Sequence, residues 1–334
     1  MPLSIVRGDI VKMKTDAIVN TTNNAMQSSS GVCGAIFKAA GAGDLQRRCN
    51  KIGYCKTGSA VATEGFKLSK YIIHTVGPIW QGADSGERKI LYACYRNSLM
   101  LAKKNECESI AFPLISSGAN GYPNEKALRV AIKAIGDFLL ENDMTVLLVL
   151  LKDTKFSLSG KQHSSIQKFI SENYMDEQHI KISQLEIEAL RETAASHNKS
   201  DNLKHSSTAT FDDLIDPKES FAQMLFKLID ERQNRFPKDS DVYRRANLDR
   251  RVFAAIKKPN YQPSRNTAIC LAFALELPLD DTLELLGRAG YTLSSSNTHD
   301  LIVRYFINEK EFDIFKINET LYQYGQSLLG QSMK

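Results

Sequence analysis

The sequence contains no run of about 18 consecutive apolar residues, the length that a membrane-spanning helix requires. Its first residues lack the apolar segment of a secretory signal. The six cysteines include no C-x-x-C pair, which argues against the common zinc-ligand spacings and against a small disulfide framework. These absences predict a protein of the reducing cytoplasm, with no membrane partner, no metal and no cofactor.

Neither positive nor negative charge is in large excess. The net charge is +5, because 43 Lys and Arg residues face 38 Asp and Glu residues. Such a mild excess favours a nucleic-acid partner only if the charges gather in one region. The hydrophobic fraction of 43% is typical of globular proteins, and 334 residues predict about two domains.

The first half alternates short apolar runs with longer amphipathic stretches. The short runs, at residues 17–20, 71–76, 109–113 and 145–151, are rich in β-branched residues. They are typical of strands that are covered on both faces. The longer stretches, at 87–104, 124–140 and 159–173, have helical spacing. We therefore predict an α/β domain, with helices layered on a sheet, over residues 1–176.

The composition changes after this domain. Residues 177–216 include clusters of Ser, Asn, His and Thr, which is typical of a polar linker. From Phe211 onward apolar residues return only at helical spacing. The sequence therefore predicts a smaller, all-α second domain over residues 217–334.

Two glycine-bearing loops follow predicted strands and open predicted helices. They span residues 30–34 and 116–123. Main-chain N–H groups at helix N-termini attract anions, so a pair of such loops predicts a site for linked phosphates. Neither loop has the Walker A or the G-x-G-x-x-G pattern. The alternative is that both are tight turns that bind no ligand.

Five motifs occur together in a fixed order: residues 8–10, 16–23, 31–41, 73–78 and 117–123. In this order they resemble the motifs of a macrodomain of the ADP-ribose-binding, Appr-1″-p processing type. The resemblance covers about residues 1–176. It implies a three-layer α/β/α module with a mixed sheet that binds ADP-ribose or an ADP-ribosylated protein.

The resemblance also implies roles for individual residues. Asp9 and the Ile10 backbone would contact adenine, Asn23 would lie beside the distal ribose, and Asn20 would shape the same pocket. The diphosphate would be held by residues of the two loops: Gly31, Val32, Cys33, Gly34, Ser116, Ser117, Gly118, Ala119, Asn120, Gly121 and Tyr122.

Two positions depart from the family pattern. Active hydrolases often have an aspartate where Cys33 stands, and an aromatic residue where Asn120 stands. A thiol orients water less well than a carboxylate, unless the helix start favours its thiolate. Catalysis by Asn23, with or without Cys33, would make the protein a hydrolase of ADP-ribosyl esters or of O-acetyl-ADP-ribose. The alternative is a non-catalytic reader that couples ADP-ribose to DNA or to a protein partner.

Other candidate residues have simpler interpretations. Cys33, Cys49 and Cys55 could bind zinc, but we expect small thiols in the core. His74, inside a predicted buried strand, is expected to be a hydrogen-bonded structural residue.

Residues 220–291 resemble the Cro/C1-type helix-turn-helix fold. In that comparison residues 249–258 would be the recognition helix. The positively charged residues expected to contact DNA are Arg244, Arg245, Arg250, Arg251, Lys257 and Lys258. The alternative is a protein-binding bundle, because Val252, Phe253 and Ile256 make much of the predicted recognition helix apolar.

Overall fold

The computed structural model describes residues 2–82, 86–151, 154, 161–174, 219–258 and 261–330. Within these residues the first half forms a six-stranded sheet in the order β1-β6-β5-β2-β4-β3. The strands are β1 (Leu3–Arg7), β2 (Ala17–Thr21), β3 (Ala60–Glu64), β4 (Tyr71–Thr75), β5 (Ser109–Pro113) and β6 (Thr145–Leu150). All neighbours are parallel except β3, which pairs antiparallel with β4 at one edge. The predicted α/β fold with a mixed sheet is confirmed.

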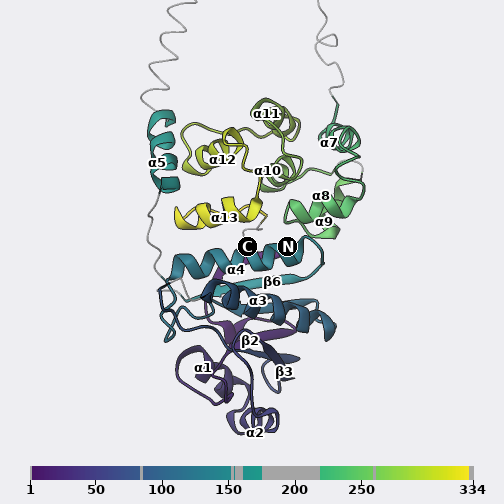
Figure 1. The fold of residues 1–334 in the computed structure, drawn as a ribbon. Coiled ribbons are helices and arrows are strands. Elements are labelled where there is room, and N and C mark those ends of the chain that lie inside the picture. The colour runs from purple at the N-terminus through teal and green to yellow at the C-terminus, as the bar shows by residue number, and fades with distance from the viewer. Residues whose placement is uncertain are drawn as a thin grey trace, which may run out of the picture.

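Helices cover both faces of this sheet (Figure 1). One face carries the short 3₁₀ helix η1 (Ile10–Lys12), α1 (Gly31–Ala40) and α2 (Ala42–Ile52), and the other carries α3 (Glu87–Lys104) and α4 (Asn124–Leu139). In β2, Ala17 and Val19 face one core cluster while Ile18 faces the other. Burial on both faces explains the nearly continuous apolar runs.

The predicted strands and the helices at 87–104 and 124–140 are confirmed within a residue or two. The antiparallel strand β3 and the helix α2 were not predicted. Helix α5 (Lys161–Asn173) lies within the third predicted helix.

The C-terminal region is helical, as predicted. Its helices are α7 (Phe221–Asp230), α8 (Asp239–Arg245), α9 (Arg250–Ile256), α10 (Arg265–Ala274), α11 (Leu279–Arg288), α12 (Thr298–Asn308) and α13 (Ile314–Gln323). Ser220, Asp249 and Ser264 accept hydrogen bonds from main-chain N–H groups at their helix starts, which satisfies donors that helix termini leave unpaired.

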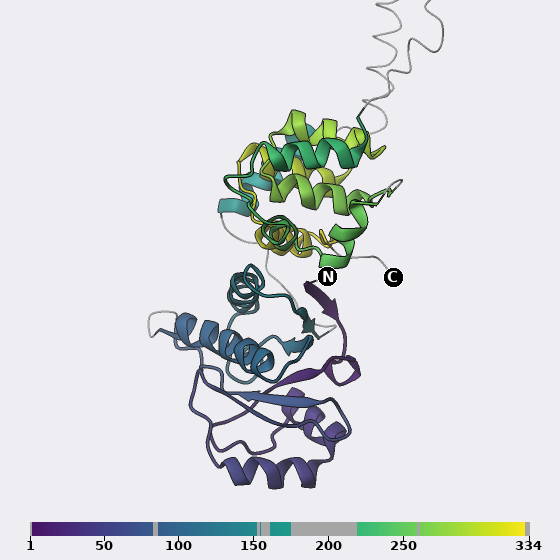
Figure 2. The same cartoon turned by 90° about the vertical axis from the view of Figure 1, so that its right-hand side faces the viewer.

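Strand β1 joins the sheet to the C-terminal helices (Figure 2). The side chain of Asn247 accepts a hydrogen bond from the Leu3 N–H (2.9 Å) and donates one to the Leu3 carbonyl (3.1 Å). Asn247 is fully buried and has a positive φ of 50°. Its amide therefore pairs with the outer edge of β1 as a neighbouring strand would, and covers that edge.

Helix α4 packs directly against α13 (Figure 1). A Cβ atom on Gly136 would lie 2.9 Å from the Phe315 ring, so the ring rests against the bare backbone of α4. Arg129 of α4 also pairs with Glu319 of α13 at 3.2 Å. One apolar cluster runs from α3 and α4 into the C-terminal helices without interruption.

Helix α5, which was expected to close the first domain, packs against α12 in the C-terminal region. The predicted linker at 177–216 and the boundary after residue 176 lie in 175–218, outside the described residues. The division into two domains therefore stays a prediction.

His74 is the structural residue that the sequence predicted. It is fully buried in β4, where its Nδ1 lies 3.1 Å from the Asn20 Nδ2 and its Nε2 lies 3.0 Å from the Thr63 Oγ1. A neutral ring protonated on Nε2 satisfies both contacts, because Asn20 then donates and Thr63 accepts. Burial lowers the pKa of His74 to about 4.

We predict that acid destabilises the fold through His74. The unfolded chain takes up a proton on this ring near pH 6.5, whereas the folded chain does so only near pH 4. The stability contributed by the neutral ring is therefore present above pH 6.5 and is lost as the pH falls towards 4. The loss should reach about 3 kcal/mol, since each pH unit is worth about 1.4 kcal/mol. Urea denaturation across this pH range measures it.

A His74→Gln variant is the control for this titration. It should be less stable at neutral pH and should show a flatter dependence on pH. An unchanged slope in this variant would assign the acid sensitivity to other groups.

Candidate ligand-binding site

Strands β2 and β5 separate at their carboxyl ends. They pair only through Ala17 with Ile110 and Ile18 with Ala111, while the last three residues of β2 pair with β4 alone. At this end β2 stays paired with β4 on one side, whereas β5 on the other side is no longer paired with it. Such divergence between adjacent parallel strands is where open α/β sheets bind ligands.

The loop after β2 leads into α1 with its first amides unpaired. Ser30, the N-cap, makes no side-chain hydrogen bond to the helix. Among the described residues, no acceptor is recorded for the N–H groups of Gly31, Val32 and Cys33. Gly34 must remain without a side chain, because a Cβ there would lie 2.4 Å from the Ser29 carbonyl oxygen. This helix start therefore offers three donors to an anion.

The loop after β5 offers a second set of donors. The Gly121 N–H donates to the Gly118 carbonyl, and the Tyr122 N–H donates to the Ser116 carbonyl. The N–H groups of the intervening residues, 118–120, have no recorded acceptor in the described part of the chain. A Cβ on Gly118 would meet no atom within 4 Å, so the space in front of this loop is open.

Contacts from the segment after β4 brace this second loop. Asn120 donates a side-chain hydrogen bond to the Gly77 carbonyl, and its own carbonyl accepts one from the Trp80 N–H. A Cβ on Gly77 would lie 2.1 Å from the Ser116 Oγ, so only glycine permits this approach. The Trp80 ring packs 4.6 Å from the Tyr122 ring, centroid to centroid. Residues 77–80 therefore hold the loop on one side, while the side at Gly118 stays open.

Asp9 and Asn23 are both exposed near strand ends. Asp9 follows β1 and caps η1, where its Oδ1 accepts from the Val11 N–H at 3.1 Å. The Ile10 N–H has no recorded acceptor within the described ranges. Asn23 follows β2, and its Oδ1 accepts from the Gln27 N–H at 3.1 Å. This bond fixes the Asn23 amide and leaves its NH₂ group available.

Several of the predicted site residues direct their side chains inward. Asn20 is fully buried against His74, and Cys33 is only 3% exposed, with its thiol 3.9 Å from the Gln27 carbonyl. Tyr122 is 3% exposed. Cys33 therefore contributes a main-chain amide to the loop, while its thiol belongs to the core cluster under α1.

Two buried oxygens at this edge of the sheet lack a partner among the described residues: the Asn20 Oδ1 and the Ser116 Oγ. Ser116 also has a positive φ of 65°, which is uncommon outside glycine. Sequence patterns give no signal for either feature.

Ion pairs involve four of the six residues predicted to contact DNA. Arg244 pairs with Asp143 of the first half at 2.9 Å, Arg245 with Glu276, Arg251 with Asp249, and Lys257 with Asp239. The hydrogen bond from Arg244 holds the pKa of Asp143 below its usual range, and Arg250 acts in the same direction. Lys258 is exposed. The start of α9 therefore lies close to the sheet domain.

Comparison with known proteins agrees with this arrangement. The model of the family described as Macro domain matches residues 19–131. A macro domain-containing protein of Methanosarcina mazei is 49% identical over 150 residues, which cover 44% of this chain and 80% of the relative. The chain belongs to the macro domain family. An O-acetyl-ADP-ribose deacetylase of Salmonella typhimurium is 46% identical over 142 residues, covering 41% of this chain and 79% of the relative.

A solved structure of the Oceanobacillus iheyensis macrodomain with ADP is 37% identical to this chain. The match covers 55% of this chain and 92% of that one, with a TM-score of 0.43.

The described part of this macro domain protein contains no group of three or more His, Cys, Asp or Glu residues placed to hold a metal ion. Cys33, Cys49 and Cys55 are free and buried, as expected of core thiols. Within the same residues, every helix is too short or too polar to cross a membrane.

We predict opposite responses to alanine at two glycines of this site. Gly77→Ala should lower the free energy of unfolding by about 1–3 kcal/mol, because the new methyl group would overlap the Ser116 Oγ and the Ile115 Cγ2. Gly118→Ala should be neutral or slightly stabilising, because its methyl group meets open space. Chemical denaturation of the two variants measures the difference. Equal stabilities would show that the loop after β5 is not braced as described.

Proposed function

We propose that this protein binds ADP-ribose at the carboxyl edge of its sheet. The observation that carries the proposal is the pair of unpaired amide runs, 31–33 and 118–120, on the loops that follow adjacent strands. Two such runs suit the two phosphates of a diphosphate. The family relationship supports the same ligand.

The two ends of the ligand are assigned from the residues near the strand ends. Asp9 keeps one carboxylate oxygen beyond its bond to Val11, and that oxygen can accept a hydrogen bond from the adenine amino group. The Ile10 N–H lies next to it in the chain. Asn23, with its free NH₂ group, is assigned to the distal ribose.

A Gly118→Glu variant tests the binding site. The protein should fold, because nothing lies within 4 Å of the new Cβ, but the added carboxylate should block and repel the diphosphate. Affinity for ADP-ribose measured by calorimetry should fall by at least about 100-fold. The matched control is Gly287→Glu in α11, where a Cβ also meets nothing within 4 Å. Unchanged affinity in Gly118→Glu would disprove the assigned diphosphate site.

Asp9→Asn tests the adenine end in the same assay. The new amide oxygen can still accept from the Val11 N–H, so the cap of η1 is kept. Its NH₂ group would then face the adenine amino group, donor against donor. We expect a loss of about 1–3 kcal/mol of binding free energy.

We further propose that bound esters of ADP-ribose are hydrolysed. The water would lie between the diphosphate and the Asn23 amide, attack the ester carbonyl carbon and release acetate from O-acetyl-ADP-ribose. A diphosphate oxygen would accept the proton of the water and pass it to the ribose oxygen as the bond between that oxygen and the carbonyl carbon breaks. The Salmonella relative named as an O-acetyl-ADP-ribose deacetylase supports this activity.

A non-catalytic reader is the alternative, and the position of Cys33 favours it. Its thiol faces the core, so no side chain replaces the aspartate that active hydrolases often place there. The helical domain would then relay occupancy of the site. Its resemblance to a helix-turn-helix fold stays a prediction, and the pairing of Arg244 with Asp143 favours contacts of this arginine within the chain over contacts to DNA.

Release of acetate from O-acetyl-ADP-ribose separates the two candidates. The hydrolase predicts turnover that falls by about 10- to 100-fold in Asn23→Ala, because the residue that positions the water is lost. Cys33→Ala should change the rate little, since the thiol faces the core and not the ligand. Binding of ADP-ribose without acetate release above background would establish the reader.

A further inference from the structure

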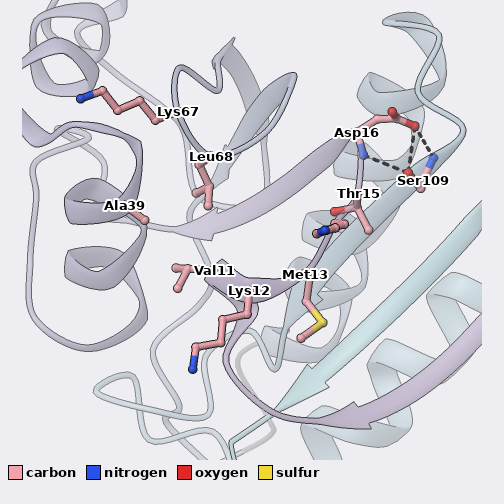
Figure 3. A pocket seen from close by; sticks show the side chains of 10 residues that line it. Val11, Lys12, Met13, Thr15, Asp16, Ala39, Lys67, Leu68 and Ser109 are labelled. Carbon is pink, nitrogen blue, oxygen red and sulfur yellow. Dashed lines mark hydrogen bonds between the residues drawn. The ribbon is translucent and has the colours of Figure 1, made fainter. Parts of the chain in front are cut away.

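A second concave surface lies at the amino ends of the strands, opposite the site proposed for ADP-ribose. Asp16 precedes β2, Leu68 precedes β4 and Ser109 opens β5, and these three strands are parallel. The three residues therefore lie at the amino ends of the strands, away from the glycine loops. Together with residues 11–15, Ala39 and Lys67 they line an open surface pocket of about 740 Å³ (Figure 3).

This lysine pocket has an apolar wall and a basic rim. Val11, Met13 and Leu68 are half-buried and pack against the core cluster beneath them. Three exposed lysines complete the lining: Lys12, Lys14 and Lys67. In Figure 3, Val11 and Leu68 lie between Lys12 and Lys67.

The positive charge of the rim is not neutralised from within. No ion pair or side-chain hydrogen bond of the three lysines is recorded in the described part of the chain. The carboxylate of Asp16, the acidic residue of the lining, is hydrogen-bonded to Glu108 and Ser109. Its Oδ2 accepts a hydrogen bond from the Glu108 N–H at 2.9 Å. It also accepts from the Ser109 N–H and the Ser109 Oγ at 2.9 and 2.8 Å (Figure 3).

The chemistry of the lining defines a ligand class. Lysine ammonium groups bind phosphate as flexible point charges, and apolar walls hold the face of a ring. We propose that the lysine pocket is a second ligand site, separate from the glycine loops, that binds a nucleotide-sized phosphate ester.

Helix η1 separates this pocket from the proposed adenine end of the first site. Asp9 and Ile10 begin that short helix, whereas Val11 and Lys12 line the lysine pocket. The two sites are thus adjacent in the chain but use different residues. Each can therefore be tested without the other.

The test is calorimetric titration of the full chain with uridine 5′-monophosphate, with and without saturating ADP-ribose. We expect binding in both arms, weakened by salt. The double variant Lys12→Glu with Lys67→Glu should bind the probe at least about tenfold more weakly. Inorganic pyrophosphate should bind more weakly than the nucleotide, because it has no ring for the apolar wall.

A control of equal charge change is Lys89→Glu with Lys104→Glu, at exposed positions on α3. Probe affinity should stay at the wild-type value in this control. Equal loss in both double variants, or no loss in the first, would overturn the proposal. Displacement of the probe by ADP-ribose would also overturn it, by assigning the probe to the first site. If ADP-ribose itself fails to bind while the probe binds, only the function proposed for the glycine loops is disproved.

Discussion

Unpaired backbone N–H groups at one edge of the sheet are the constraint on which the rest of the structure depends. Such donors are tolerated where solvent or an anion reaches them, and the fold keeps them accessible by holding each loop from behind. Gly34 lets the Ser29 carbonyl approach α1, and Gly77 lets the β4 segment approach Ser116. Glycine is thus needed at these two positions for close packing, whereas at Gly118 its absence of a side chain leaves room in front of the loop.

Much of this arrangement could be predicted from the sequence, for physical reasons. Strands buried on both faces must be apolar throughout, so β2, β4, β5 and β6 were recognisable as short apolar runs. Strand β3 was not, because it lies at the sheet edge and its residues are only partly buried. Helix α2 is mostly polar and buries only Leu45 and Cys49, too few apolar residues to mark a helix in the sequence. The glycine loops were predictable because glycine itself is the signal.

The direction of a side chain was less predictable than its position. Asn20 and Cys33 fall within the expected motifs, yet strand and helix register direct both into the core. The basic residues of the helical domain show the same limit. Charge counting identified Arg244 and Arg245, but their partners Asp143 and Glu276 become neighbours only in the folded chain. A surplus of positive charge in sequence is therefore partly consumed by tertiary structure.

Strand β1 connects the C-terminal helices to Asp9, which we propose contacts adenine. Its start is held by Asn247, and near its end the Arg7 guanidinium lies 5.3 Å from the centre of the Tyr322 ring of α13. Asp9 follows two residues later. Strand β1 therefore contacts the C-terminal helices both at its start and near its end, while its ladder with β6 runs through Arg7. The loop after β5, by contrast, is braced by the segment that follows β4.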